Sequence, residues 1–217
     1  MNLNLLIDHT YLKAMGTSKE IDQLVVEAAQ WKFKSVCLNP VWVKYAKEKL
    51  EGTGVLVCTV IGFPLGANTT ETKVFETLDA VQNGADEIDM VVNVGRVKSG
   101  DDAYVKTEIE RIVKAAHGRA VKVIIETCYL TKEEIARVSA VVGSTGAVFV
   151  KTSTGFGTAG ATPEDVKIMK DASHKQVKAA GGVKTKEDLD KMIDAGATRI
   201  GTSNGVALMT SGEGTGY

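Results

Sequence analysis

Short apolar runs alternate with helix-like segments along almost the whole of this 217-residue chain. The runs are rich in Val and Ile, which is typical of parallel strands that are covered on both faces. Eight of them are expected to form strands, at residues 3–10, 35–39, 55–62, 87–94, 121–127, 147–152, 176–180 and 199–202. A strand followed by a helix, repeated about eight times, predicts an α/β fold of the (β/α)8 (TIM) barrel type. A doubly wound open sheet is the alternative, although no Gly-x-Gly-x-x-Gly turn follows the first strand.

The segments between the expected strands carry signals for the start and the end of helices. Thr17 and Thr131 are each followed three residues later by a glutamate, which is the spacing of a capping box. Pro163 stands where a first helical turn accepts proline, and Thr185 precedes an acidic first turn. Three glycines are expected where helices end: Gly84, Gly143 and Gly196.

The composition excludes some classes of function. The net charge of −1 gives no support to nucleic-acid or membrane-surface binding, and no apolar run approaches the roughly 18 residues of a membrane helix. The N-terminus lacks the basic region and the cleavage site of a signal peptide. Cys37, Cys58 and Cys128 are expected to be reduced thiols of a cytoplasmic protein, and the wide Cys and His spacing predicts no metal site. One domain is expected over residues 1–217, with a mobile tail at 210–217.

Few charged residues stand at the carboxyl ends of the expected strands, where barrels keep their functional groups. They are Asp8, Asp89, Glu126, Lys151 and Lys178, with Lys122 earlier in its strand. One strand-helix unit separates Lys151 from Lys178, so the two should lie on adjacent strands. An amine beside a second cation loses its proton more easily, and a neutral amine can form a Schiff base with a carbonyl. The alternative is that both lysines extend past the strand ends to solvent, and spacing alone does not decide which one is the nucleophile.

Three further residues near these strand ends have two interpretations each. Asp89 either transfers protons to a neighbouring lysine or a bound water, or makes a structural ion pair inside the barrel. Lys122 fits an internal ion pair better than a nucleophile. Cys37 either lines the pocket or is a buried free thiol.

Glycine-rich stretches follow the seventh and eighth expected strands, where barrels often bind phosphate through backbone N–H groups. They are Gly181-Gly182 and the segment 201–205, in which Ser203 and Asn204 add side-chain donors. Ordinary turn formation is the alternative for both. The loop 61–66 after the third strand is expected to be a turn.

Seven segments of the chain together resemble the class I deoxyribose-phosphate aldolase family. They are residues 7–10, 35–40, 60–66, 87–93, 150–156, 177–182 and 199–203, and they span nearly the full length. The resemblance implies a barrel that reversibly cleaves 2-deoxy-D-ribose 5-phosphate into acetaldehyde and D-glyceraldehyde 3-phosphate, with no metal and no cofactor. It implies a cytoplasmic lyase of deoxyribonucleotide catabolism that meets small sugar phosphates and aldehydes, and it is compatible with a homo-oligomer, either dimer or tetramer. The alternatives are another Schiff-base lyase and a non-catalytic phosphosugar-binding barrel.

The same resemblance implies roles for single residues. Lys151 forms the Schiff base, Lys178 is the neighbouring cation that favours loss of its proton, and Asp89 transfers protons with Lys178 through water. Asp8 and Thr154 meet substrate hydroxyls, and Cys37 is placed with them in the substrate pocket. The phosphate-binding set is Gly155, Gly181, Gly182, Lys184, Gly201, Ser203 and Asn204.

Two positions bear on how closely the chain follows the family's pattern. Some members carry a phosphate-holding lysine where this chain has Phe156, and Lys184 is the residue expected to compensate. Members also end in a tyrosine that reaches the site, and Tyr217 is the counterpart here.

Overall fold

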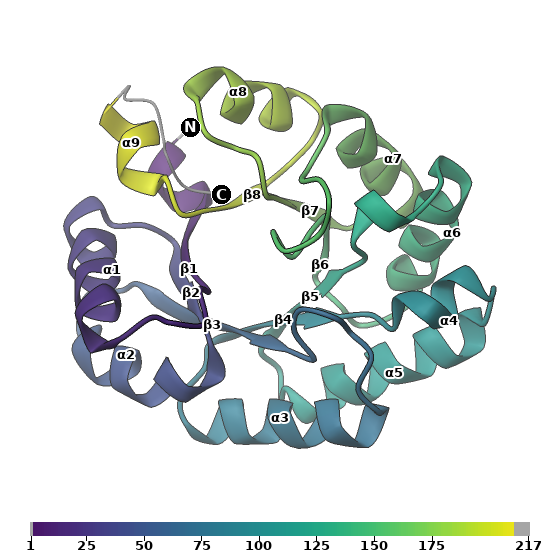
Figure 1. Cartoon of the computed structure of the whole chain (residues 1–217), viewed down its shortest axis with the longest axis horizontal. Helices are drawn as coiled ribbons and strands as arrows, with labels where there is room; N and C mark the ends of the chain where they lie inside the picture. Colours follow the sequence, from purple (N-terminus) through teal and green to yellow (C-terminus); the bar gives the residue numbers. More distant parts are fainter. Residues whose placement is uncertain (1, 211–217) are drawn as a thin grey trace.

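Eight parallel strands form a closed barrel in the order β1 to β8, with the helices outside the ring (Figure 1). The computed structural model describes residues 2–210. The strands are β1 (Ile7–Tyr11), β2 (Ser35–Leu38), β3 (Leu56–Ile61), β4 (Glu87–Val91), β5 (Ala120–Ile124), β6 (Phe149–Lys151), β7 (Gln176–Ala180) and β8 (Arg199–Thr202). The predicted (β/α)8 barrel is confirmed, because β1 pairs with β8 and closes the sheet.

The helices follow the strands along the chain. They are α1 (Ser18–Trp31), α2 (Val43–Lys49), α3 (Thr70–Gln82), α4 (Val94–Lys98), α5 (Asp102–Ala115), α6 (Lys132–Gly143), α7 (Pro163–Ser173), α8 (Lys186–Asp194) and α9 (Gly205–Thr210). Three short 3-10 helices are η1 (Leu3–Leu6), η2 (Pro40–Trp42) and η3 (Thr127–Tyr129). Thr210, at the start of the predicted mobile tail, ends α9, while the rest of that tail, including Tyr217, lies outside the described residues. None of the described helices has the length and the apolar character needed to span a membrane.

The predicted helix starts are confirmed. Thr17 and Thr131 form complete capping boxes with their glutamates, and Thr185 forms one with Asp188. Each box satisfies two backbone N–H groups that a free helix end leaves unpaired. The helix ends predicted at glycines are also confirmed. Helix α6 ends at Gly143, and Gly84 and Gly196, which follow α3 and α8, have positive φ.

Several predicted strands are too long at their ends. Residues 3–6 form η1, so the first strand starts at Ile7. The fourth strand ends at Val91, and Val94 begins α4 after the Asn93 side chain accepts a hydrogen bond from the Arg96 N–H. The apolar pattern runs on across these boundaries, although η1, which precedes the first strand, buries none of its side chains.

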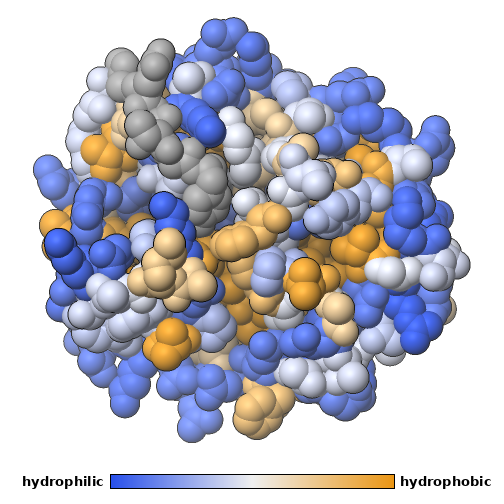
Figure 2. All heavy atoms as spheres, in the orientation of Figure 1, coloured by the Kyte–Doolittle hydropathy of each residue, from blue (hydrophilic) through white to orange (hydrophobic). Residues whose placement is uncertain are grey.

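Side chains alternate along each strand between the barrel interior and the surrounding helices. Ile88 and Val150 belong to the apolar cluster between the sheet and the helices, whereas their neighbours Asp89 and Lys151 meet inside the barrel. The interior is therefore charged and the outer layer is apolar. On the face of the molecule seen in Figure 2, apolar side chains gather near the middle and polar ones surround them.

Candidate active site

Asp89 is the centre of the charged barrel interior. Its Oδ2 accepts hydrogen bonds from the Nζ atoms of Lys151 and Lys178, each at 2.7 Å. Its Oδ1 accepts from Lys122 Nζ at 2.8 Å and from the Cys58 thiol at 3.1 Å. The parallel register brings the lysines together, because Lys151 lies opposite Lys178 and Lys122 opposite Asp89. The predicted proximity of the two lysines on adjacent strands is confirmed.

A second layer of carboxylates holds the same cations from the other side. Asp8 Oδ2 lies 2.6 Å from Lys178 Nζ, and Asp8 Oδ1 accepts from Arg199 Nη1 at 2.8 Å. Glu87 Oε2 lies 2.7 Å from Lys122 Nζ and 2.9 Å from the same guanidinium. Lys122 therefore makes the internal ion pair that its early place in the strand predicts. Asp8, expected at a substrate hydroxyl, is fully buried with both oxygens facing cations.

The protonation of this network follows from its contacts. Burial alone would raise the pKa of Asp89, but the three lysines around it hold that pKa well below its usual range. Burial alone would lower the pKa of Lys178, but Asp8 and Asp89 outweigh it and raise that pKa above its usual range. Lys178 therefore stays a cation at neutral pH, directly beside Lys151.

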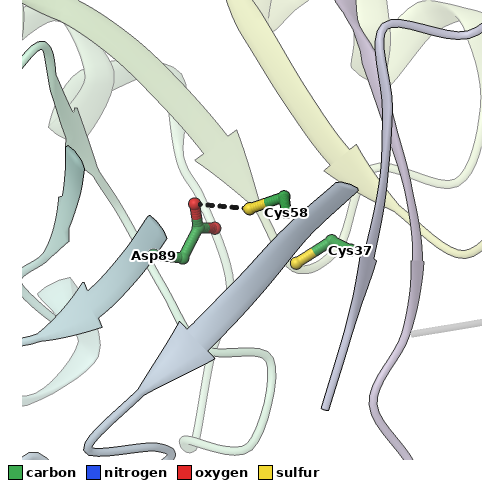
Figure 3. A group of neighbouring side chains, drawn as sticks. All are labelled: Cys37, Cys58 and Asp89. Carbon is green, nitrogen blue, oxygen red and sulfur yellow. Dashed lines mark hydrogen bonds between the residues drawn. The ribbon is translucent and has the colours of Figure 1, made fainter. Parts of the chain in front are cut away.

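Two thiols complete the interior next to Asp89 (Figure 3). Cys37 and Cys58 face each other across β2 and β3, and their sulfur atoms and an Asp89 oxygen all lie within 4.8 Å of one another. Thiolate and carboxylate can bind a metal ion, but here the Asp89 oxygens already accept from three ammonium groups, which such an ion would have to displace. Cys37 is fully buried, as its interpretation as a buried thiol requires.

The glycine loops lie at the ends of β6, β7 and β8. Gly181 and Gly182 have φ of 77° and 81°, values that other residues rarely adopt. The loop after β6 packs on them, because the Ala161 N–H donates to Gly181 O and a Cβ on Gly160 would lie 2.3 Å from that oxygen. Gly201 has a different reason to be glycine: a Cβ there would lie 3.0 Å from Lys178 Cε.

The other members of the predicted phosphate-binding set are spread around these loops. Gly155 has φ of 86° in the loop after β6. Ser203 is half-buried and Asn204 is buried, and both stand just before α9. Lys184 is exposed, and its backbone N–H donates to Asp188. The structure therefore brings the glycines of β7 and β8 toward one end of the barrel and leaves Lys184 at its surface.

Glu126 has no role in the sequence-based site, yet it is buried at the end of β5. Its carboxylate accepts hydrogen bonds from the backbone and the hydroxyl of Thr154. With Thr154 it forms the polar wall of a cavity of about 80 Å³. The remaining lining residues are Pro64, Leu65, Val94, Tyr129, Phe156 and Gly157. In the sequence, the signal that could have identified Glu126 as a site residue is its position as a charged residue at the end of an expected strand.

A larger cavity, of about 490 Å³, lies elsewhere, around the turn between α2 and β3. None of its lining residues belongs to the charged network, so this larger cavity does not coincide with the buried lysines.

Known proteins resemble this chain over nearly all of its length. A family model described as DeoC/LacD family aldolase matches residues 3–210. The chain is 59% identical over 211 residues to deoxyribose-phosphate aldolase 2 of Staphylococcus aureus (strain MRSA252), and the match covers 96% of each protein. It is 58% identical over 211 residues, with the same coverage, to deoxyribose-phosphate aldolase of Staphylococcus haemolyticus (strain JCSC1435). The tetrameric deoxyribose phosphate aldolase from Aeropyrum pernix superimposes with a TM-score of 0.90 at 34% identity, over 96% of this chain and 90% of that one.

Proposed function

The chain belongs to the DeoC/LacD family of aldolases, and from this premise we propose that it is a deoxyribose-phosphate aldolase. It reversibly cleaves 2-deoxy-D-ribose 5-phosphate into acetaldehyde and D-glyceraldehyde 3-phosphate, in the catabolism of deoxyribonucleotides. The observation that carries the proposal is the carboxylate of Asp89, shared at 2.7 Å by the lysines of two adjacent strands.

Contacts within the network favour Lys151 as the nucleophile. Lys151 pairs with one carboxylate, that of Asp89, whereas Lys178 pairs with two and Lys122 lies within 4 Å of three. Loss of a proton from Lys151 therefore gives up the fewest ion pairs. Its side chain is also 3% exposed, whereas those of Lys122 and Lys178 have no exposure at all.

The reaction proceeds through covalent catalysis. The neutral Lys151 amine attacks the C1 aldehyde of the open-chain sugar and loses water to give an iminium. The C3 hydroxyl then loses its proton, the C2–C3 bond breaks, and its electrons pass into the iminium to leave an enamine. Protonation at C2 and hydrolysis release acetaldehyde and restore the amine. Asp89, which touches both Lys151 and Lys178, passes protons between them during these steps.

Binding of the rest of the substrate is assigned to the strand ends beside Lys151. The loops of Gly155, Gly181-Gly182 and Gly201, with Ser203, Asn204 and Lys184, receive the phosphate through backbone and side-chain donors. Thr154 meets a sugar hydroxyl as an acceptor, because its own proton is given to Glu126. Asp8 and Cys37, expected at the substrate, are both fully buried. Asp8 pairs with Lys178 at 2.6 Å and Cys37 lies within 4.8 Å of an Asp89 oxygen, so we assign them to holding these two groups in place.

Borohydride trapping tests the covalent step. With acetaldehyde and borohydride, the wild-type protein should gain the mass of one reduced adduct, which peptide mapping places on Lys151. Lys178→Leu should lose the label at neutral pH and recover part of it at higher pH. If Lys151→Leu keeps the aldolase rate, the assignment is wrong.

Two comparisons separate the alternatives. Cleavage of ketose phosphates at a higher rate than 2-deoxyribose 5-phosphate would indicate another Schiff-base lyase. Binding of sugar phosphate with no trapped adduct would indicate a non-catalytic phosphosugar-binding barrel.

Location and assembly are part of the same proposal. We place the enzyme in the cytoplasm, as a dimer or a tetramer, and the tetrameric relative from Aeropyrum pernix supports self-association. Size-exclusion chromatography with light scattering measures the assembly directly, and a mass of one chain would contradict this part.

A further inference from the structure

Glu126 has a backbone conformation that its position does not explain. Four described residues other than glycine have positive φ. Three of them, Lys32, His117 and His174, are exposed and stand just past the ends of helices, where a left-handed residue is common. Glu126, with φ of 54°, is 3% exposed and follows a strand. A strained, buried residue of this kind persists where the surrounding structure holds it, and such residues cluster at functional sites.

Most hydrogen bonds around Glu126 lead to the segment that carries Lys151; the exception is its own carbonyl, which accepts from the Tyr129 N–H at 3.1 Å. The N–H groups of its two neighbours, Ile125 and Thr127, donate to the carbonyls of Lys151 and Thr152, each at 3.0 Å. Its own carboxylate accepts from the Thr154 N–H at 3.1 Å and from the Thr154 hydroxyl. The segment from Lys151 to Thr154 is therefore fixed to β5 by its backbone on both sides of Glu126 and by the carboxylate in the middle.

The next loop closes over the same carboxylate. Thr154 Oγ1 accepts from the Phe156 N–H at 3.0 Å, which extends the chain of hydrogen bonds. A Cβ on Gly157 would lie 3.3 Å from the Glu126 carboxyl group and 2.7 Å from Cys128 Sγ. Only glycine fits there without displacing these groups, so the loop packs directly on the carboxyl group.

We propose that Glu126 is a positioning residue for Lys151. It fixes the strand end that carries the nucleophile through Thr154, and these contacts hold its negative charge beside the segment that carries the same amine. The inference rests on the proposed function and adds to it a residue with two separable effects, one through hydrogen bonds and one through charge.

The groups around Glu126 determine the pKa of its carboxyl group, and so the pH range in which it is charged. Burial raises the pKa of its carboxyl group, and the hydrogen bonds from Thr154 and the charge of Lys151 oppose that rise. The other titratable side chains around it are Cys128, on η3, and Tyr129, which lines the same cavity. The Glu126 anion attracts the ammonium group of Lys151, so removal of the Glu126 charge should let Lys151 form the imine at lower pH.

Glu126→Gln tests both effects, because glutamine keeps the shape and removes the charge. Borohydride trapping should still label Lys151. The pH at which trapping is half-maximal should fall by about one unit, and kcat at the plateau should fall about tenfold with KM changed less than threefold. A purely structural role would not move the pH midpoint.

Two further variants separate the effects. Thr154→Val removes the hydroxyl but leaves the carboxylate, so the rate of trapping by acetaldehyde, which lacks the sugar hydroxyl that Thr154 meets, should fall severalfold with the pH midpoint unchanged. This result tests the hydrogen-bond effect if Glu126→Gln does not fold. Glu108→Gln is the matched control, since it neutralises another fully buried glutamate, on α5 and outside the barrel; it should leave the midpoint in place.

The outcomes distinguish this inference from the function on which it rests. If Glu126→Gln keeps both the midpoint and kcat while Lys151 is still trapped, the role of Glu126 is refuted and the aldolase stands. An unchanged rate of trapping by acetaldehyde in Thr154→Val refutes the hydrogen-bond effect. If the wild-type protein traps no adduct, the proposed function itself fails.

Discussion

Two buried lysines of this protein, Lys178 inside the barrel and Lys73 between α3 and α5, have opposite protonation tendencies. Both side chains have no exposure. Lys178 meets the carboxylates of Asp8 and Asp89, and they raise its pKa in spite of burial. Lys73 meets one carboxylate, that of Glu108 at 2.9 Å, and there burial prevails and lowers its pKa. The carboxylates in contact, and not burial by itself, therefore set the direction in which the pKa of each buried lysine is shifted.

The two regions also differ in what they support. In the barrel network Lys178 lies against a glycine of the expected phosphate loops, since a Cβ on Gly201 would lie 3.0 Å from its Cε. Lys73 instead donates to Val91 O at 2.9 Å, and a Cβ on Gly62 would lie 2.7 Å from its Cε. Glu108 accepts from the Asn93 N–H at 3.3 Å. The Lys73–Glu108 pair thus connects the loops after β3 and β4, so its role is structural.

The largest expected effect comes from Asp89→Asn. It leaves three ammonium groups without their shared carboxylate, so it should lower the free energy of unfolding by about 3–5 kcal/mol. The aldolase kcat should also fall by about a hundredfold or more, because the amide no longer passes protons between Lys151 and Lys178. Urea denaturation and steady-state kinetics measure the two effects. A loss of stability below about 1 kcal/mol would mean that the network does not need its central charge.

A smaller effect is expected from Glu108→Gln. It should cost about 1–3 kcal/mol, because Lys73 can lose its proton and keep a hydrogen bond. Trapping at Lys151 should persist, since the pair lies outside the barrel. The same denaturation experiment measures it, and a cost equal to that of Asp89→Asn would break the contrast between the two regions.

The double replacement Lys73→Met with Glu108→Leu should stay within about 1 kcal/mol of the wild type, since apolar residues of similar size often replace a buried pair without loss. It should therefore be more stable than Glu108→Gln alone. Denaturation of the three proteins side by side gives the comparison. A double variant less stable than the single one would show that the pair contributes net stability.

The smallest effect is a difference in pH dependence. The pKa of Asp89 is lowered, so its stabilisation is present above the unfolded value of 3.8 and is lost as pH falls through the folded value. Burial raises the pKa of Glu108, so its contribution falls as pH rises from 4.5 through its folded value. Relative to the wild type, the double variant should thus gain up to about 1 kcal/mol above pH 4.5, and both should lose stability together in acid. Thermal unfolding between pH 3 and 7 tests this, and parallel curves above pH 4.5 would contradict it.

The amino-acid sequence alone determined the barrel, its helix starts and the pairing of Lys151 with Lys178. These features depend on local patterns: the capping box of Thr17 needs four consecutive residues, and two lysines one strand-helix unit apart must meet in a parallel sheet. The ends of the first and fourth strands were missed, because apolar residues continue into η1 and α4.

Only the tertiary structure decided which charges meet and which backbone is strained. Asp89 contacts lysines 62 and 89 residues away in the sequence, so no local pattern records that one carboxylate serves both. The burial of Asp8 and the left-handed conformation of Glu126 likewise depend on partners from other strands. The physical reason is that the energy of a charge in a protein interior depends on the few groups within about 4 Å of it. The pairing of strands in the closed sheet determines which groups these are.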